Sequence, residues 1–304
     1  MNVLIVGLGS IALKHYYALN NLEKNIKILA LRSKINCNSI DGINNIFSLA
    51  DLNEKIDFAI ISNPTFKHIN SIKNLIFLNI PLMIEKPLSH NLEGVLELDK
   101  VLIKNNIITY VACNLRFHPC INFLKNNINK LLNEINEVNV YCGSYLPNWR
   151  DEDYKNSYSS ISSMGGGVHL DLIHEIDYVS WIFGLPESQN SYNSNKSNLN
   201  IDSVDYANYV LNYKNFNVSV ILNYYRPIPK RTIEIICYND IWEIDLINNT
   251  VIKNNKIVFQ EKNYNLNETY EKQLKYFMKC ISDFTKPMNS FNESVNVLKI
   301  CLNK

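Results

Sequence analysis

The sequence lacks several features that would place it in a class at once. No apolar run reaches the roughly 18–20 residues that a membrane-spanning helix needs. The 30 Lys and Arg residues are balanced by 29 Asp and Glu residues, so the formal net charge is +1. Charge therefore indicates neither nucleic acid nor an anionic membrane as a partner. With 46 % hydrophobic and 19 % charged residues, and no evident internal repeat, the composition is that of a globular protein.

Cysteine and histidine are present without the spacing of a structural or metal site. No Cys-x-x-Cys pair occurs, and no histidine stands at ligand spacing from a cysteine or a pair of carboxylates. We expect reduced thiols, no disulfide framework and no metal. The start of the chain lacks a basic segment and glycines interrupt its apolar stretch, so no secretion signal is predicted and a cytoplasmic protein is expected. The cysteines are Cys37, Cys113, Cys120, Cys142, Cys237, Cys280 and Cys301.

The first fifteen residues carry the most informative motif. Val3–Val6 is a short apolar run that predicts a buried parallel strand. It is followed by the spacing Gly-x-Gly-x-x-Ala, which permits a tight turn, close approach of a pyrophosphate and packing of a helix on the strand. A helix over Ile11–Leu19 would offer backbone N–H groups and a positive dipole end to phosphates. The pattern predicts a dinucleotide site, with a structural glycine turn as the alternative. The cofactor contacts predicted here are Gly7, Gly9, Ser10, Ile11 and Ala12.

The second predicted strand, Ile26–Leu31, should end at the residue that reads the adenosine ribose. An acidic residue there binds the 2′-hydroxyl of NAD, but this chain has Arg32, Ser33 and Lys34. An arginine pairs with a 2′-phosphate or lies on the adenine, so these residues favour NADP over NAD. A solvated basic turn is the alternative.

Two further predicted strands lead into loops with polar residues. Asp57–Ser62 is followed by Asn63, Thr65 and His68, at the strand end where parallel sheets bind ligands. These three are predicted cofactor contacts, and each could instead be a helix cap.

Pro81–Ile84 runs into Glu85, Lys86 and Pro87. A lysine at the carboxyl end of a core strand can polarise a substrate oxygen or hold a proton. Glu85 can fix this lysine or contact the cofactor ribose. The alternative is a surface ion pair.

A helix over Asn91–Lys104 and a strand over Ile107–Ala112 complete a series of alternating strands and helices. The alternation predicts an α/β fold with a doubly wound parallel sheet over residues 1–119. Asn114, just after the last strand, is added to the predicted cofactor contacts. The apolar positions expected to face the core from the helix are Leu92, Val95, Leu96, Leu98 and Val101.

Five segments together resemble the Gfo/Idh/MocA family of NAD(P)-dependent oxidoreductases. They are GLGSIALKH at 7–15, SNPTFKH at 62–68, EKP at 85–87, NLRFHP at 114–119 and GGGVHLDLIHEID at 165–177. The resemblance implies a dinucleotide-binding Rossmann domain followed by a substrate-binding domain over residues 120–304. It also implies that Lys86 is catalytic and that the Lys86–Pro87 bond is cis.

The second predicted domain begins with a helix over Ile121–Ile135 and a strand over Val138–Tyr145. Residues 147–163 are polar with aromatics and too long for a tight turn, and such loops carry function or form mobile flaps. Trp149, Arg150 and Tyr154 are predicted substrate contacts, because a tryptophan face and a fixed donor fork suit sugars and carboxylates.

Three glycines at 165–167 open a helix predicted to run to Phe183. Asp171 and His174 are three residues apart and share one face of it. The resemblance implies that His174 is the acid/base residue. Many family members have an aspartate four residues before this histidine, where this chain has Leu170. We expect Asp171 either to take the place of this aspartate from a shifted register or to contact a substrate hydroxyl.

Most of the remaining chain reads as strands. Ser188–Asn200 is predicted to be a polar surface loop. Short turns between the strands imply a largely antiparallel sheet, one face of which covers the helix before it. The resemblance implies that the open face joins subunits into a homodimer or homotetramer. The predicted strands and closing helices are Val204–Tyr213, Val218–Tyr225, Thr232–Tyr238, Ile241–Leu246, Ile257–Gln260, Glu268–Phe284 and Glu293–Leu302.

The leading hypothesis is hydride transfer between nicotinamide and a secondary alcohol or ketone. His174 would act as general acid/base and Lys86 would polarise the oxygen. The resemblance to members that act on sugars or nucleotide-activated sugars in bacterial surface-polysaccharide synthesis indicates the substrate class. Arg116 and Arg150 would hold its carboxylate or phosphate, or form structural ion pairs. The alternatives are a redox-neutral NAD-using epimerase or glycosidase, and a non-catalytic cofactor-binding sensor.

Overall fold

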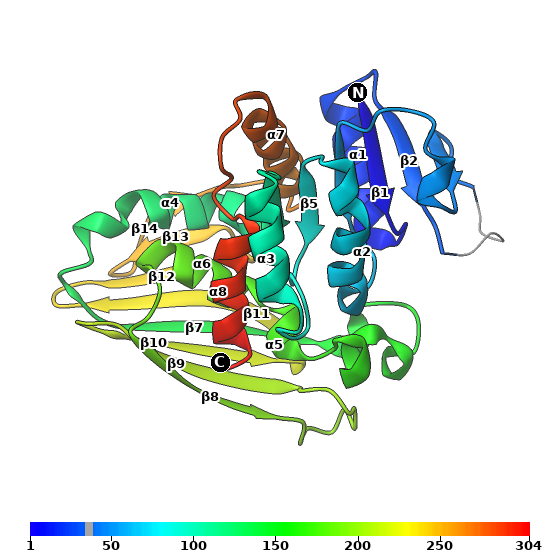
Figure 1. Ribbon diagram of the computed structural model, residues 1–304. Coiled ribbons are helices and arrows are strands. Elements are labelled where there is room, and N and C mark those ends of the chain that lie inside the picture. Colours follow the sequence, from blue (N-terminus) through cyan, green and yellow to red (C-terminus); the bar gives the residue numbers. More distant parts are fainter. Residues whose placement is uncertain (34–38) are drawn as a thin grey trace. The chain divides into compact units, whose positions relative to one another are not determined.

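The computed structural model describes residues 1–33 and 39–304, and the chain forms two compact units (Figure 1). Unit 1 comprises Met1–Asn114 and Leu266–Val295, and unit 2 comprises Leu115–Asn265 and Asn296–Lys304. The sequence predicted two contiguous domains, whereas the structure returns residues 266–295 to the first unit. Lys34 and Cys37, which the sequence analysis singled out, lie outside the described residues.

Unit 1 contains a six-stranded sheet with the strand order β3-β2-β1-β4-β5-β6, in which every pair is parallel. This confirms the predicted doubly wound sheet, and only β3 was not expected. Strands β4 and β5 are buried at every residue and β1 at all but its first, which explains their continuous apolar runs. The strands are β1 (Asn2–Val6), β2 (Lys27–Leu31), β3 (Ile43–Ile46), β4 (Phe58–Ile61), β5 (Leu82–Glu85) and β6 (Thr109–Ala112).

Helix α7 (Glu268–Ser282) brings the returning segment into the core of unit 1. The Phe277 ring meets the Phe58 ring edge-on at 5.6 Å and stacks on Tyr110 at 5.7 Å between ring centroids. The other helices that begin in this unit are α1 (Ser10–Leu22), α2 (His68–Leu75), α3 (Val95–Lys104) and α8 (Phe291–Cys301).

Helix α3 is shorter than predicted. It begins after Gly94, whose φ of +66° lies in the left-handed region that suits glycine. Leu96 and Val101, expected to face the core, are 44 % and 39 % exposed. Val95, Leu98 and Leu102 carry the packing, as the 3.6-residue period requires once the helix starts there.

Unit 2 contains an eight-stranded sheet with the order β14-β13-β12-β11-β7-β10-β9-β8, antiparallel except for the β7–β10 pair. It confirms the predicted largely antiparallel sheet. The prediction of a loop over residues 188–200 is wrong, because residues 188–194 form the edge strand β8. Strand β13 was also missed. The strands are β7 (Ile135–Tyr145), β8 (Ser188–Ser194), β9 (Tyr206–Asn212), β10 (Asn217–Asn223), β11 (Tyr225–Cys237), β12 (Ile241–Asp245), β13 (Thr250–Lys253) and β14 (Lys256–Gln260).

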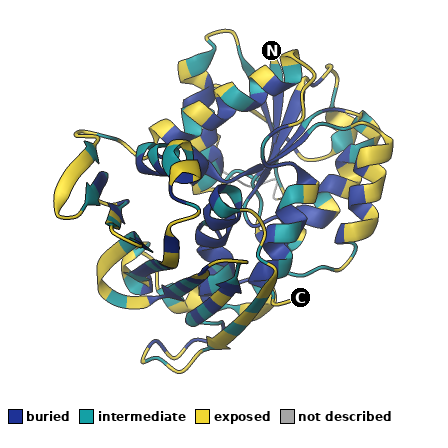
Figure 2. Ribbon diagram, turned by 90° about the vertical axis from the view of Figure 1, so that its left-hand side faces the viewer, coloured by how far each residue is buried: buried dark blue, intermediate teal, exposed yellow. Residues whose placement is uncertain are grey.

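The two faces of this sheet differ along each central strand. In β9, Ala207, Tyr209 and Leu211 are fully buried, and the Tyr209 hydroxyl donates to the Cys301 carbonyl of α8 at 2.8 Å. The residues between them face the other, more exposed side (Figure 2). We call the two sides the helix-covered face and the open face. The remaining helices of unit 2 are α4 (Pro119–Asn127), α5 (Val168–Asp171) and α6 (His174–Phe183).

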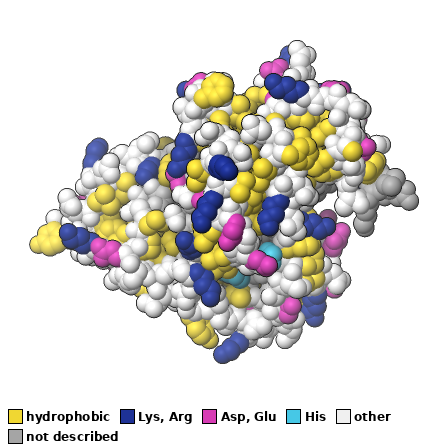
Figure 3. All heavy atoms as spheres, in the orientation of Figure 1, with side chains coloured by type: hydrophobic (Ala, Val, Ile, Leu, Met, Phe, Trp, Pro, Cys, Tyr) yellow, Lys and Arg dark blue, Asp and Glu magenta, His cyan; other side chains and the backbone are white. Residues whose placement is uncertain are grey.

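The surface agrees with the balanced charge of the sequence. On the side seen in Figure 3, basic side chains are interspersed with acidic ones. Among the helices of the described residues, none is long and apolar enough to cross a membrane.

Candidate active site

The turn between β1 and α1 leaves room for a ligand above the helix. Gly7 has φ of +86°, and a Cβ atom there would lie 2.8 Å from the Cα atom of Asn63. Gly9, the N-cap of α1, is different: a Cβ atom there would meet nothing within 4 Å. No side chain caps the helix, so the backbone N–H groups of its first turn have no partner within the helix beside this open position. The turn therefore fits the pyrophosphate of a dinucleotide.

Arg32 follows β2 at the predicted position. Its Nη1 atom donates to Asn45 Oδ1 of β3 at 3.3 Å, and the neighbouring Ser33 is exposed. No acidic side chain stands at the end of β2 within residues 31–33, where NAD-binding folds commonly carry one.

His68 ties two loops together instead of presenting its ring to a ligand. The ring is 1 % exposed, with Nδ1 at 3.0 Å from the Pro87 carbonyl and Nε2 at 2.8 Å from the Asn63 carbonyl. Burial lowers the pKa of His68. His68, predicted to line the cofactor, thus joins the loops that follow β4 and β5 in this structure. Thr65 is also buried, with 6 % exposure.

The neighbouring amides are likewise engaged within unit 1. Asn63 Nδ2 donates to Ser71 Oγ at 2.7 Å. Asn114 is buried, and its Nδ2 atom donates to Thr269 Oγ1 of α7 at 2.7 Å. The structure thus holds Asn114, predicted as a cofactor contact, against the segment that returns to this unit.

Lys86 follows β5 on a backbone that buried groups hold in place. Glu85 Oε2 accepts the Lys86 backbone N–H at 3.2 Å, and Glu85 Oε1 lies 2.6 Å from Nε2 of His15. His15 is fully buried in α1, and its ring meets Tyr270 edge-on at 5.6 Å. The Lys86–Pro87 peptide is cis, as expected. Glu85 was predicted either to fix Lys86 or to contact the cofactor ribose; in the structure its carboxylate binds the Lys86 backbone N–H and lies against His15.

In unit 2, the helix expected from the glycines to Phe183 is interrupted. Helix α5 ends at Asp171, Leu172 has φ −100° and ψ 29°, and α6 begins at His174. The prediction of one continuous helix is therefore wrong. The break places His174 in the first turn of a new helix.

Two tyrosines surround Asp171, which is 4 % exposed. The Tyr224 hydroxyl donates to its Oδ2 atom at 2.6 Å. The charge of Asp171, together with burial, raises the pKa of Tyr158. Burial and the same charge raise the pKa of Tyr224. Both phenols consequently remain protonated donors near the carboxylate, and neither was predicted from the sequence.

Two predicted substrate contacts lie beside these tyrosines. The Trp149 ring meets the Tyr224 ring edge-on at 5.3 Å, and its Nε1 atom donates to Ser144 Oγ at 2.9 Å. The Arg150 guanidinium lies 4.8 Å from the centroid of the Tyr158 ring. The structure thereby gathers Trp149, Arg150 and Asp171 around one pair of phenols. Tyr154 is directed elsewhere, with its hydroxyl donating to the Leu199 carbonyl at 3.0 Å.

Helix α6 carries two buried ion pairs in the turn that begins with His174. Arg231 of β11 binds both carboxylate oxygens of Glu175, at 2.6 and 3.0 Å. Arg116 binds both carboxylate oxygens of Asp177, at 2.9 and 2.7 Å.

Arg116 was predicted to hold a substrate carboxylate or phosphate, with a structural ion pair as the alternative. Its side chain is 4 % exposed and its guanidinium is paired with Asp177, so the structure supports the alternative. No group of three or more His, Cys, Asp or Glu residues within 1–33 and 39–304 could hold a metal ion.

Unit 1 combines a parallel sheet with a glycine turn that leads into an uncapped helix, and unit 2 is a second α/β unit. This combination is typical of two-domain dinucleotide-binding oxidoreductases. Two family descriptions match consecutive parts of the chain. The NAD-binding Rossmann fold of the Gfo/Idh/MocA oxidoreductases matches residues 1–113, and the C-terminal alpha/beta domain of that family matches residues 125–299. The chain belongs to the Gfo/Idh/MocA oxidoreductase family.

Several solved structures share this fold over nearly the whole chain. Myo-inositol 2-dehydrogenase from Lactobacillus plantarum has 19 % identity and a TM-score of 0.81, with coverage of 99 % of this chain and 95 % of that one. The WlbA dehydrogenase from Bordetella pertussis, in complex with NADH and UDP-GlcNAcA, has 14 % identity, a TM-score of 0.83 and coverage of 99 % and 93 %. UDP-N-acetylglucosamine 3-dehydrogenase GnnA from Acidithiobacillus ferrooxidans has 16 % identity, a TM-score of 0.77 and coverage of 100 % and 96 %. No curated protein matches the chain significantly.

Proposed function

We propose that this protein is an NAD(P)-dependent dehydrogenase or reductase that acts on a CH–OH group of a sugar or nucleotide-activated sugar. The observation that carries the proposal is in unit 1, where a glycine turn suited to a pyrophosphate follows β1 and a lysine on a fixed backbone follows β5, the two strands that flank β4 in one parallel sheet. When bound, the nicotinamide cofactor supplies the hydride chemistry. The residues Gly7–Ala12 hold its pyrophosphate, and Arg32 with Ser33 contacts the adenosine ribose.

The chain itself supplies polarisation and proton transfer. The Lys86 ammonium donates to the substrate oxygen and stabilises the charge that develops there. His174 removes the hydroxyl proton in oxidation and returns it in reduction, a role worth about 10²–10⁴-fold in rate. Asp171 orients His174 or accepts from a substrate hydroxyl, and the phenol of Tyr224 fixes its carboxylate.

The proposed substrate class has two kinds of support. Trp149 offers an aromatic face and Arg150 a guanidinium beside Asp171, which suits a polyhydroxylated ring with an acidic group. Fold relatives include enzymes described with UDP-GlcNAcA and with levoglucosan. We further propose that the protein acts in surface-polysaccharide synthesis. We also propose that it forms a homo-oligomer through the open face of the unit 2 sheet.

Arg32 favours NADP, because its guanidinium can pair with a 2′-phosphate. Residues 31–33, at the end of β2, contain no acidic side chain that would bind the 2′-hydroxyl of NAD. The binding constants of NADP and NAD, measured by calorimetry on wild type and Arg32→Ala, test this choice. We expect NADP to bind more tightly to wild type and the preference to disappear in the variant. A strong preference of wild type for NAD would refute it.

A screen of sugars and nucleotide sugars with both cofactors tests the function. Nicotinamide absorbance should change with at least one substrate, and Lys86→Ala and His174→Ala should lose that turnover while remaining folded. Product formed without any absorbance change would favour a redox-neutral epimerase or glycosidase. Full biological activity in both variants would favour a sensor. Turnover confined to an unrelated alcohol would refute the sugar assignment.

A further inference from the structure

A buried histidine of unit 1, His15, has no role in the proposed mechanism. It lies on the inner face of α1 with Ala12, Ala18 and Leu19, and its side chain is fully buried. Its Nε2 atom lies 2.6 Å from Oε1 of Glu85, at the end of β5. Its Nδ1 atom is also buried and has no hydrogen-bond partner within the described residues. The polar contact that His15 makes in this part of the chain is therefore the one with Glu85.

Packing alone does not explain why His15 is paired with Glu85. Glu85 is 8 % exposed, and a buried carboxylate is unfavourable unless hydrogen-bond donors satisfy it. An ionised carboxylate only accepts hydrogen bonds, so Nε2 of His15 is the donor in this contact. Apolar side chains of similar volume are commonly as stable as such a buried pair, or more stable. What the carboxylate adds is an acceptor for the residue that follows it.

The second carboxylate oxygen of Glu85 holds the backbone of Lys86. Oε2 accepts the Lys86 N–H at 3.2 Å, while Oε1 accepts from His15. His15 thus orients a carboxylate whose other oxygen fixes the peptide that carries the lysine. Beyond Lys86, the Pro87 carbonyl lies 3.0 Å from Nδ1 of the buried His68. The backbone is consequently tied on both sides of Lys86.

Helix α7 of the returning segment packs against His15. The Tyr270 ring meets the His15 ring edge-on at 5.6 Å, and the Lys14 ammonium lies 5.2 Å from the centroid of the Tyr270 ring. Burial and the charge of Glu85 raise the pKa of Tyr270, so its phenol remains protonated. A neutral ring packed against the imidazole restricts its rotation, which keeps Nε2 directed at Glu85.

We propose that His15 is a positioning residue for Lys86. Through Glu85 it holds the Lys86 backbone where the ammonium reaches the substrate oxygen. The proposal rests on the proposed function, because a lysine that polarises a substrate depends on its position for its effect. A displacement of about 1 Å can lower a rate about 10²-fold, so a residue that acts through another can control turnover.

Hydrogen exchange of the Lys86 amide, resolved by mass spectrometry on the full chain, measures this contact without a substrate. His15→Leu removes the donor and keeps an apolar side chain in its place. Exchange at Lys86 should become about tenfold faster in this variant, the expected effect of loosening one hydrogen bond to a charged group. His15→Gln, whose side-chain amide can also donate to Glu85, should restore most of the protection.

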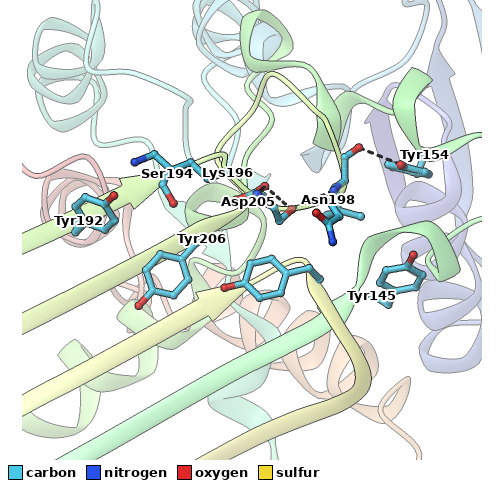
Figure 4. Close-up of a pocket in the computed structure, with 11 residues that line it drawn as sticks. Tyr145, Tyr154, Tyr192, Ser194, Lys196, Asn198, Asp205 and Tyr206 are labelled. Carbon is cyan, nitrogen blue, oxygen red and sulfur yellow. Dashed lines mark hydrogen bonds between the residues drawn. The ribbon is translucent and has the colours of Figure 1, made fainter.

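Two matched controls separate positioning from general stability. Asn21→Ala removes the 2.6 Å hydrogen bond from Asn21 Nδ2 to Glu271, which also joins α1 to α7. Ser197→Ala removes the 2.6 Å hydrogen bond from the Ser197 hydroxyl to the buried Asp205 carboxylate of unit 2 (Figure 4). Both controls should leave the exchange of the Lys86 amide at its wild-type rate.

Turnover of the sugar found in the cofactor screen gives a second readout. His15→Leu should lower kcat by about 10- to 100-fold. It should leave the binding constants of NADP and NAD, measured by calorimetry, unchanged. The proposal is overturned if cofactor binding weakens while kcat stays the same, because Glu85 then contacts the cofactor ribose. It is also overturned if Lys86 exchange in His15→Leu equals that of wild type, or if His15→Gln is as impaired as His15→Leu.

A double variant covers the case in which His15→Leu does not fold. His15→Leu with Glu85→Leu replaces the pair by apolar side chains, so stability should be recovered while the Lys86 N–H loses its acceptor. Fast Lys86 exchange and a low kcat in this folded variant support the proposal, and a wild-type value of either overturns it. If no sugar changes nicotinamide absorbance with wild type, the proposed function fails, and Lys86 exchange still decides whether His15 holds Lys86.

Discussion

Replacing Arg231 with methionine should destabilise unit 2 strongly. Arg231 is the partner of Glu175, whose side chain is fully buried, and two hydrogen bonds of 2.6 and 3.0 Å join them. The Arg231→Met side chain fills a similar volume but leaves the carboxylate without a counter-charge. Removing one partner of a buried pair costs about 3–5 kcal/mol. For a unit of this size, that predicts a fall in Tm of roughly 6–20 °C.

The double variant separates loss of the pair from loss of packing. Glu175→Leu with Arg231→Met replaces the whole pair by apolar side chains, and should recover most of the stability because no charge remains buried. Lys286→Met is the surface control: its pair with Glu293 is 65 % and 41 % exposed, so its loss should cost less than about 1 kcal/mol.

Denaturant unfolding followed by circular dichroism measures these differences. The reasoning is refuted if Arg231→Met unfolds at the same denaturant concentration as Lys286→Met. It is also refuted if the double variant is no more stable than the single one. Either result would mean that water solvates the Glu175 carboxylate in the folded protein.

Four further predictions concern single positions. Gly7→Ala should lower stability by more than about 1 kcal/mol, since its φ is +86° and the new Cβ meets Asn63; Gly9→Ala should leave Tm unchanged but weaken cofactor binding in calorimetry. Burial lowers the pKa of His169 to about 4, below its value of about 6.5 in the unfolded chain. As the pH decreases from about 6.5 to about 4, the unfolded chain therefore binds a proton before the folded chain does, and the free energy of unfolding decreases. His169→Gln should make this decrease smaller in urea titrations. Arg116→Met should lower Tm as Arg231→Met does, without a specific change in KM.

The parallel sheet was predictable because its signals are local. Fully buried strands such as β4 and β5 read as short apolar runs, and the glycine spacing after β1 is contained within a few residues. The cis Lys86–Pro87 bond was foreseen through resemblance alone.

Strand β8 could not be read from its sequence, Ser-Gln-Asn-Ser-Tyr-Asn-Ser. It lies at the edge of the sheet and none of its residues is buried, so it carries no apolar alternation. Antiparallel backbone pairing with β9 forms this segment into a strand instead. The interruption between α5 and α6 was missed for a related reason, because neither proline nor glycine marks it.

The residues that complete the site lie far away in the chain. His15 and Glu85 are 70 residues apart, and Tyr224 and Asp171 are 53 apart. Such pairs leave no periodic trace in a single sequence. Arg116 is the opposite case. An arginine indicates an anionic partner, which is correct here, but the sequence did not identify that partner as Asp177 of the same unit.

The central claim is that Lys86 and the glycine turn serve hydride transfer. The most direct test measures nicotinamide absorbance while NADP or NAD is incubated with the panel of sugars and nucleotide sugars, using wild type and Lys86→Ala in parallel. The account predicts cofactor reduction or oxidation with at least one substrate in wild type and its loss in folded Lys86→Ala. Equal rates in the two proteins would contradict it.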